Sequence, residues 1–170
     1  MADQEYKIPK TRYEFREGFS VAGLRKQFDV DEKIDGIPAL WKAFGPQIAE
    51  VANAVTDACY GVIGASNPDG DVDYLAGIKV TSFDGLDKDF DRMVIPDQNY
   101  LVVTHEGDVS NIQQTWDWIF VEFPKSLGLE IIEVFAMTPE FEVYDARYNP
   151  QTREGEIDIW VPVQPSIMPA

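Results

Sequence analysis

Two runs near the C-terminus constrain the fold most strongly, residues 138–144 and 155–163. Both are rich in β-branched and aromatic residues, which is typical of strands, and together they predict a hairpin. The first run carries a carboxylate, Glu142, between apolar and aromatic neighbours. Because an ionised group is costly to bury without a partner, Glu142 is expected either to face water or to meet a positively charged group.

Strand alternation places Glu142 and Tyr144 on one face and Phe141 and Val143 on the other. If Phe141 and Val143 pack against helices, Glu142 and Tyr144 line the opposite side, which we expect to be a cleft. A partly desolvated carboxylate attracts an organic cation far more strongly than one in bulk water. The alternative is a strand charge that faces solvent.

The first half of the chain predicts a strand, a helix and two further strands. Tyr13 to Phe28 is expected to be a strand region, and strands are predicted at 58–65 and 72–82. Between Phe28 and the strand at 58–65, apolar residues from Ile37 to Val55 recur at the three-and-four spacing of one helical face and predict a helix.

Two prolines and one aspartate bear on the helix boundaries. Pro38 suits the first turn of the first helix, where a missing N–H costs nothing. Pro46 predicts a kink or a break near Gly45. In the second half, Asp108 or Ser110 is expected to cap a helix whose apolar face runs to Phe123, and Pro124 is expected to end it.

The second half repeats the element order, with a strand at 99–105, the helix after Asp108 and then the hairpin. We therefore predict an α+β fold of duplicated strand-helix-strand-strand modules. Its antiparallel sheet would carry two helices on one face, with a cleft between the halves. Residues 1–12 are expected to be an N-terminal lead-in and 13–164 a single domain with pseudo-repeats at about 13–82 and 93–164. Residues 165–170 are expected to be a tail.

The net charge of -16 disfavours direct nucleic-acid binding, because no basic patch is present to displace counterions from phosphates. It favours cationic partners, although it also serves solubility alone. Cys59 is the only cysteine, so no intrachain disulfide can form, which fits a reducing compartment. No long apolar run predicts a membrane span, and the N-terminus lacks signal-peptide features. A cytoplasmic location is expected.

Cofactor and metal chemistry find little support in the sequence. His105 is the only histidine and lies far from Cys59, so no metal-ligand spacing is present. No glycine-rich phosphate loop occurs. The segment 69–73 has a superficial likeness to a calcium loop but lacks its spaced ligands, and it is interpreted as a hairpin turn. We predict neither a metal nor a cofactor.

Aromatic side chains are the natural walls for a cation, because ring faces attract positive charge by about 0.5–2 kcal/mol per ring. Trp116 falls on the apolar stripe of its helix and is assigned to the core. Tyr74 and Tyr100 are further candidates. The aromatic residues that we expect to bind ligand beside Glu142 are Tyr144, Trp160, Trp118, Trp41 and Tyr60.

An ordered set of short segments resembles the gyrase-inhibitor-like effector-binding domain, the ligand domain of multidrug-sensing transcription activators. The segments are Ile37-Pro38-Ala39-Leu40-Trp41, Tyr60-Gly61-Val62, Asp73-Tyr74-Leu75-Ala76-Gly77, Ile95-Pro96-Asp97-Gln98-Asn99-Tyr100, His105-Glu106-Gly107, Phe141-Glu142-Val143-Tyr144 and 155–163. The resemblance covers roughly residues 10 to 164. It implies paired strand-helix-strand-strand modules, a cleft for flat hydrophobic cations and a strand glutamate, Glu142 here, that meets the cationic centre. The chain has no room for the DNA-binding domain of the regulators, so a stand-alone form is expected.

Three functions remain open from the sequence. The favoured one is a binding protein for amphipathic or aromatic organic cations, with Glu142 in an aromatic cleft. The resemblance also implies a hydrolase of cyclopropane-containing genotoxins, in which Glu142 would be the general base. A gyrase-binding, toxin-protective protein is the third, because an acidic surface can imitate DNA. We favour binding over catalysis.

Overall fold

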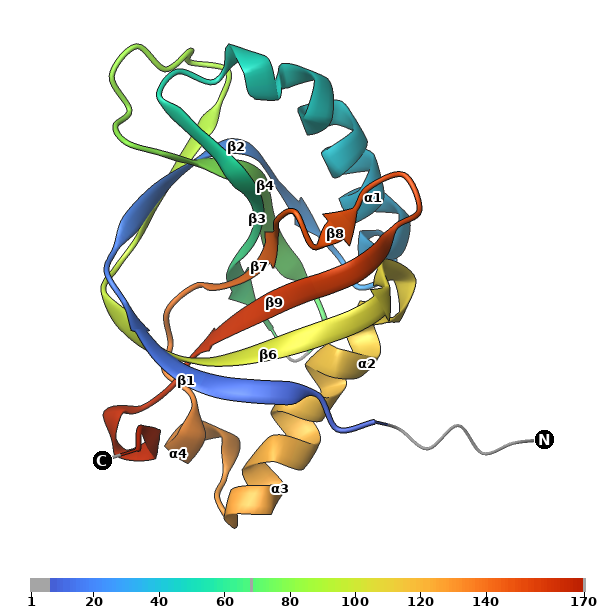
Figure 1. Cartoon of the computed structure of the whole chain (residues 1–170), viewed down its shortest axis with the longest axis vertical. Helices are drawn as coiled ribbons and strands as arrows, with labels where there is room; N and C mark the ends of the chain where they lie inside the picture. Colours follow the sequence, from blue (N-terminus) through green and yellow to red (C-terminus); the bar gives the residue numbers. More distant parts are fainter. Residues whose placement is uncertain (1–6, 68, 170) are drawn as a thin grey trace, which may run out of the picture.

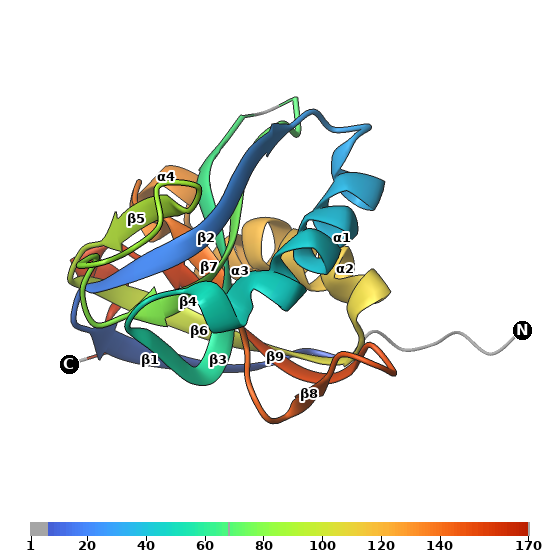
Figure 2. The same cartoon turned by 90° about the horizontal axis from the view of Figure 1, so that it is seen from above.

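Helices cover one face of a strongly curved antiparallel sheet (Figures 1 and 2). The computed structural model describes residues 7–67 and 69–169. The sheet has nine strands in the order β1-β6-β9-β7-β3-β4-β2-β5, with β8 beside β9. The strands are β1 Lys10–Arg16, β2 Phe19–Phe28, β3 Ala54–Ser66, β4 Val72–Val80, β5 Asp91–Ile95, β6 Gln98–Asp108, β7 Glu140–Tyr144, β8 Tyr148–Asn149 and β9 Glu154–Pro162.

The strand order confirms the predicted duplication. The first half, β2-α1-β3-β4, arranges its strands as β2, β4, β3, and the second half arranges the equivalent strands as β6, β9, β7. The halves join where β3 pairs antiparallel with β7, with Gly61 opposite Glu142. The extra strand before each half crosses over, because β1 pairs with β6 and β5 pairs with β2. The mixed α+β class is therefore confirmed.

The first helix, α1 Lys33–Phe44, begins earlier than predicted. Pro38 lies inside it rather than in its first turn, so that prediction was wrong. The reason is that residues 33–36, before the apolar stripe, are also helical. Pro38 is exposed, and its missing N–H removes one hydrogen bond from the helix backbone. The break near Pro46 is confirmed, because a 3-10 helix, Gly45–Glu50, follows α1.

The second helical segment is a succession of short pieces. They are the 3-10 helix Val109–Asn111, α2 Ile112–Asp117, the π-helical turn Trp118–Glu122, α3 Phe123–Leu127 and, after a loop, α4 Ile131–Val134. The Asp108 side chain accepts a hydrogen bond from the Ser110 N–H, as predicted for the cap. Pro124 does not end the segment. It lies in the first turn of α3, where no N–H is needed, and the helix ends at Gly128 with a φ of 67°.

Three clusters form the core. One lies beneath α1, a second lies beneath α2 and α3, and the third lies on the sheet face opposite the helices. The third cluster joins Phe19 and Ile95 at one end of the strand order to Tyr100 and Trp160 near the other end. The sheet must therefore curl around this cluster, and we call that side the inner face.

Secondary structure occurs within both predicted terminal segments. Strand β1 begins at Lys10, within the predicted lead-in, whose residues 1–6 lie outside the described part of the chain. Pro165–Ile167 forms a 3-10 helix in the predicted tail, and Ile167 and Met168 pack against the cluster beneath α2 and α3. No helix in the described residues combines the length and the apolar character needed to cross a membrane.

Candidate functional site

The Glu142 carboxylate is buried at the junction of the two halves, with only 5% of the residue exposed. Its Oε1 accepts hydrogen bonds from the hydroxyl groups of Tyr74 (3.0 Å) and Tyr144 (2.9 Å). Its Oε2 accepts one from the Trp116 indole N–H (2.9 Å). The donors come from β4, β7 and α2, so both halves contribute to one polar group. A carboxylate offers about four lone-pair positions, and three protein donors leave capacity for a further partner.

We call five residues around this carboxylate the Glu142 cluster: Trp41, Tyr74, Trp116, Glu142 and Tyr144. Gly61 on β3 leaves room for them. Gly61 lies opposite Glu142 in the β3–β7 pairing. A Cβ at Gly61 would stand 2.9 Å from Glu142 Oε1 and closer still to the Tyr74 hydroxyl, so only glycine leaves room for their hydrogen bond. Trp41 on α1 donates its indole N–H to the Tyr74 hydroxyl (3.0 Å), and its ring centroid lies 5.4 Å from that of Tyr144.

Among the described residues, two other acidic residues have no more than 9% of their surface exposed, and both are paired with arginine. Asp73 forms an ion pair with Arg25, and Asp158 lies 2.8 Å from the Arg147 guanidinium. Within residues 7–67 and 69–169, no Lys or Arg side chain pairs with Glu142, and its three hydrogen-bond donors are all neutral. Glu142 is therefore the buried carboxylate whose charge this part of the chain leaves without a counterion.

The electrostatics follow from this burial. Desolvation raises the pKa of Glu142, and the hydrogen bonds from Trp116, Tyr144 and Tyr74 oppose that rise. Burial and the Glu142 charge together raise the pKa values of Tyr74 and Tyr144 well above 10. Both hydroxyl groups therefore remain protonated donors to the carboxylate. The carboxylate is held by neutral aromatic donors, whose hydrogen bonds favour its ionised form.

Phe141 and Val143 do not pack against the helices, which was the condition for Glu142 and Tyr144 to line the opposite face of β7. Phe141 and Val143 belong to the inner-face cluster, whereas Glu142 and Tyr144 point toward α1 and α2. The reason is that both faces of this strand are buried, so apolar residues do not mark the helix side. Trp116 is a core residue, as predicted, but its N–H also binds Glu142. The signal for that second role is that a buried indole N–H needs an acceptor.

Tyr60 and Trp160 lie on the inner face, away from Glu142, and surround a cation of the chain itself. The Arg16 guanidinium lies 4.1 Å from the ring centroid of Phe19, 5.4 Å from Tyr60, 5.3 Å from Phe141 and 5.1 Å from Trp160. Its Nη2 also donates to the Tyr60 hydroxyl at 2.8 Å. These two aromatic residues therefore bind an internal guanidinium in this structure.

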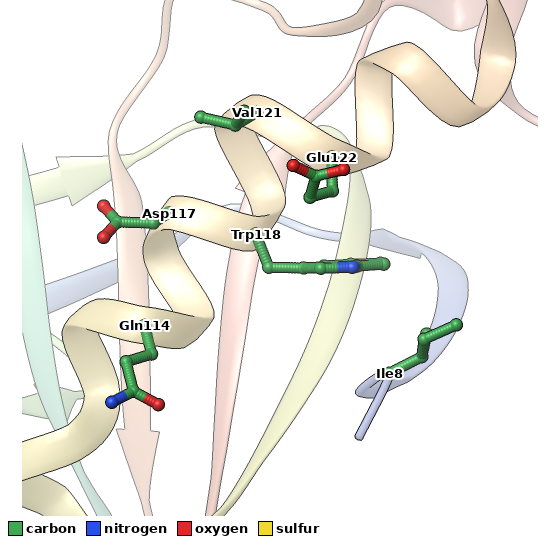
Figure 3. A pocket seen from close by; sticks show the side chains of 6 residues that line it. All are labelled: Ile8, Gln114, Asp117, Trp118, Val121 and Glu122. Atoms are coloured by element: carbon green, nitrogen blue, oxygen red, sulfur yellow. The ribbon is translucent and has the colours of Figure 1, made fainter. Parts of the chain in front are cut away.

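Trp118 is half-buried and packs against the cluster beneath α2 and α3, with its ring centroid 5.8 Å from that of Phe123. Figure 3 shows it extending toward Ile8 across a shallow surface groove of about 610 Å³. Gln114, Asp117, Val121 and Glu122 complete the lining.

Of the predicted ligand-binding residues, the structure brings together Glu142, Tyr144 and Trp41. Tyr60, Trp160 and Trp118 lie elsewhere. In the described residues no three His, Cys, Asp or Glu side chains converge to hold a metal ion. A carboxylate without a counterion, flanked by indole and phenol rings, has the chemistry to receive an organic cation.

Two comparisons with known proteins, one with a family model and one with a curated relative, bear on the family of this chain. The model of the family described as "Cass2: Integron-associated effector binding protein" matches residues 13–163. A curated relative, the transcriptional regulator BrlR of Pseudomonas aeruginosa, is 29% identical over 150 residues, which are 87% of this chain and 53% of the relative. The chain thus spans about half the length of that regulator.

Two solved structures share the fold over nearly the whole chain. SAV2435 bound to tetraphenylphosphonium has a TM-score of 0.72 at 15% identity, covering 92% of this chain and 95% of its own. The integron cassette protein VCH_CASS2 of Vibrio cholerae has a TM-score of 0.61 at 16% identity, covering 92% of this chain and 98% of its own.

Proposed function

The chain belongs to the integron-associated effector binding protein family, and on that premise we propose that it binds amphipathic aromatic organic cations beside Glu142. It is an effector-binding domain, as the resemblance to gyrase-inhibitor-like domains implies. The finer proposal concerns the charge of the effector and the group that recognises it.

The single observation that carries the proposal is the missing counterion of Glu142. Burying an ionised carboxylate costs several kcal/mol unless a positive group compensates. Asp73 and Asp158 have arginine partners, whereas the described donors to Glu142 are neutral. A cationic ligand would supply that compensation on binding, and the rings of Trp41, Trp116 and Tyr144 would supply apolar and cation–π contacts.

The comparisons support the ligand class. SAV2435 shares this fold and has been solved with tetraphenylphosphonium, a bulky aromatic cation. Because Glu142 is only 5% exposed, a ligand of that size reaches the carboxylate only when Trp41 or Trp116 moves aside. Breaking their hydrogen bonds lowers the net affinity, so we expect binding that is specific in charge but moderate in strength.

The test is a calorimetric titration with tetraphenylphosphonium at pH 8. We expect saturable binding by the wild type and a loss of about tenfold or more for Glu142→Gln, because the attraction between opposite charges in a desolvated site is lost. Tetraphenylborate has the same shape and the opposite charge, and it should not bind. Glu17→Gln, which removes an exposed carboxylate, is the matched control and should bind as the wild type does.

Equal affinities of the wild type and Glu142→Gln for tetraphenylphosphonium would refute the role of the carboxylate. Recovery of unchanged ligand by chromatography after long incubation would separate binding from turnover.

A further inference from the structure

A second carboxylate, Glu140, lies on the same face of β7 as Glu142. Residues two apart in a strand share a face, and the β3–β7 pairing places Ile63 opposite Glu140. Ile63 packs against both the cluster beneath α1 and the cluster beneath α2 and α3. Glu140 is thus held at the same junction of the two halves that contains the Glu142 cluster.

Glu140 is half-buried as a residue, and its carboxylate has no hydrogen bond or ion pair with any side chain in residues 7–67 and 69–169. Burial first, and then repulsion from Glu142, raise its pKa from 4.5 to about 7. Ile63 across the β3 ladder is apolar and supplies no charge. Two neighbouring carboxylates withdrawn from water without a cation are unfavourable for the folded protein, and a cationic ligand would relieve that cost.

Among the described residues, the other titratable groups around the pair form no ion pair with it. Tyr74 and Tyr144 stay protonated, as argued above. His105 acts electrostatically on Glu142, but its ring nitrogens bind the Thr115 hydroxyl (2.7 Å) and the Asp108 carbonyl (2.9 Å). The junction therefore offers two carboxylates to a ligand.

We propose that Glu140 is a second carboxylate of the ligand site, so that this site selects aromatic ligands carrying two positive charges over those carrying one. The proposal rests on the cation-binding function proposed above and names its ligand class. Two residues of a strand span about 6.6 Å. A rigid pair of linked aromatic rings with a positive nitrogen at each end has its charges at a comparable separation.

Methyl viologen and N-methyl-4-phenylpyridinium form a matched pair of probes. Both are flat two-ring cations of similar size, but the first carries two positive charges and the second carries one. Their affinities are measured by calorimetry at pH 8, where Glu140 is ionised, for the wild type, Glu140→Gln, Glu142→Gln and the control Glu17→Gln. Glu140→Leu serves as a second variant should Glu140→Gln fold poorly, and circular dichroism checks the fold of each.

We expect the wild type to bind methyl viologen about tenfold more tightly than the monocation. Glu140→Gln should abolish that preference, because it should weaken the binding of methyl viologen more than that of the monocation. Glu142→Gln should weaken both ligands, and Glu17→Gln should change neither.

Three results would overturn the proposal. A wild type that binds both probes equally would contradict the dication preference and leave the proposed function standing. A preference that survives in Glu140→Gln or Glu140→Leu would assign it to another group. If neither probe nor tetraphenylphosphonium binds the wild type, the proposed function itself fails, and the dication site fails with it.

Discussion

Replacing Glu140 with glutamine should stabilise the protein at high pH and have little effect at low pH. Glu140 has its pKa raised from 4.5 to about 7 by burial and by the Glu142 charge. The folded protein therefore holds a proton that the unfolded chain has released between these two values. Stability must fall as the pH rises through this window and then level off above it. Glutamine cannot ionise, so the variant escapes this loss.

The magnitude follows from proton linkage. At 1.36 kcal/mol for each tenfold change in proton affinity, a rise from 4.5 to about 7 corresponds to about 3.4 kcal/mol. Glu140 as a residue is partly exposed, and water screens its charge, so roughly 2–3 kcal/mol is a fairer expectation. The gain of Glu140→Gln over wild type should be below about 1 kcal/mol at pH 5 and should reach its full size by pH 8.

Urea unfolding followed by tryptophan fluorescence, at several pH values from 5 to 8.5, measures this gain directly. Glu17→Gln makes the same chemical change at an exposed position and should show no pH-dependent gain. A gain for Glu140→Gln that is the same at pH 5 and pH 8 would refute the reasoning, because it would mean that the Glu140 proton is not linked to folding.

Two further predictions concern packing. Gly61→Ala should destabilise the protein by about 2–4 kcal/mol in urea unfolding, because its methyl group would displace the buried carboxylate of Glu142 and its donor Tyr74. Gly45→Ala is the control, because a Cβ there meets nothing within 4 Å. An equal effect of the two substitutions would contradict the argument. Arg16→Met should lower the free energy of unfolding by about 1–2 kcal/mol in thermal denaturation, because four aromatic rings lose their cation. Arg16→Lys keeps the charge and should lose less. An unchanged free energy of unfolding for Arg16→Met would show that the cation–π contacts contribute nothing to stability.

Element order and fold class were predictable because the apolar periodicity changes from two to three-and-four at each strand–helix boundary. The faces of β7 were not predictable in the same way. Phe141 packs on the inner face and Glu142 is covered by helices, so both faces of the strand are buried. Alternation then gives two sets of residues but does not say which set meets the helices.

For the same reason, the predicted aromatic residues lie on both faces of the sheet, and only some of them are close to Glu142. Trp160 and Tyr60 have suitable ring faces, but their strands turn them toward Arg16. Trp116 was assigned to the core from its helical spacing, which is right, yet spacing carries no information about the hydrogen bond of its indole N–H. Glu140 shares its face with Glu142 by simple alternation and was available from the sequence, but its missing partner becomes visible only in three dimensions.

The crossed pairing of β1 with β6 and of β5 with β2 makes each half dependent on a strand that precedes the other. A chain cut in the connection between β4 and β5 would give two fragments that each lack an edge strand. We expect these fragments to reassemble when co-expressed, as a split reporter does. The same exchange between two intact copies, with the connection between β4 and β5 as the hinge, would produce an intertwined dimer.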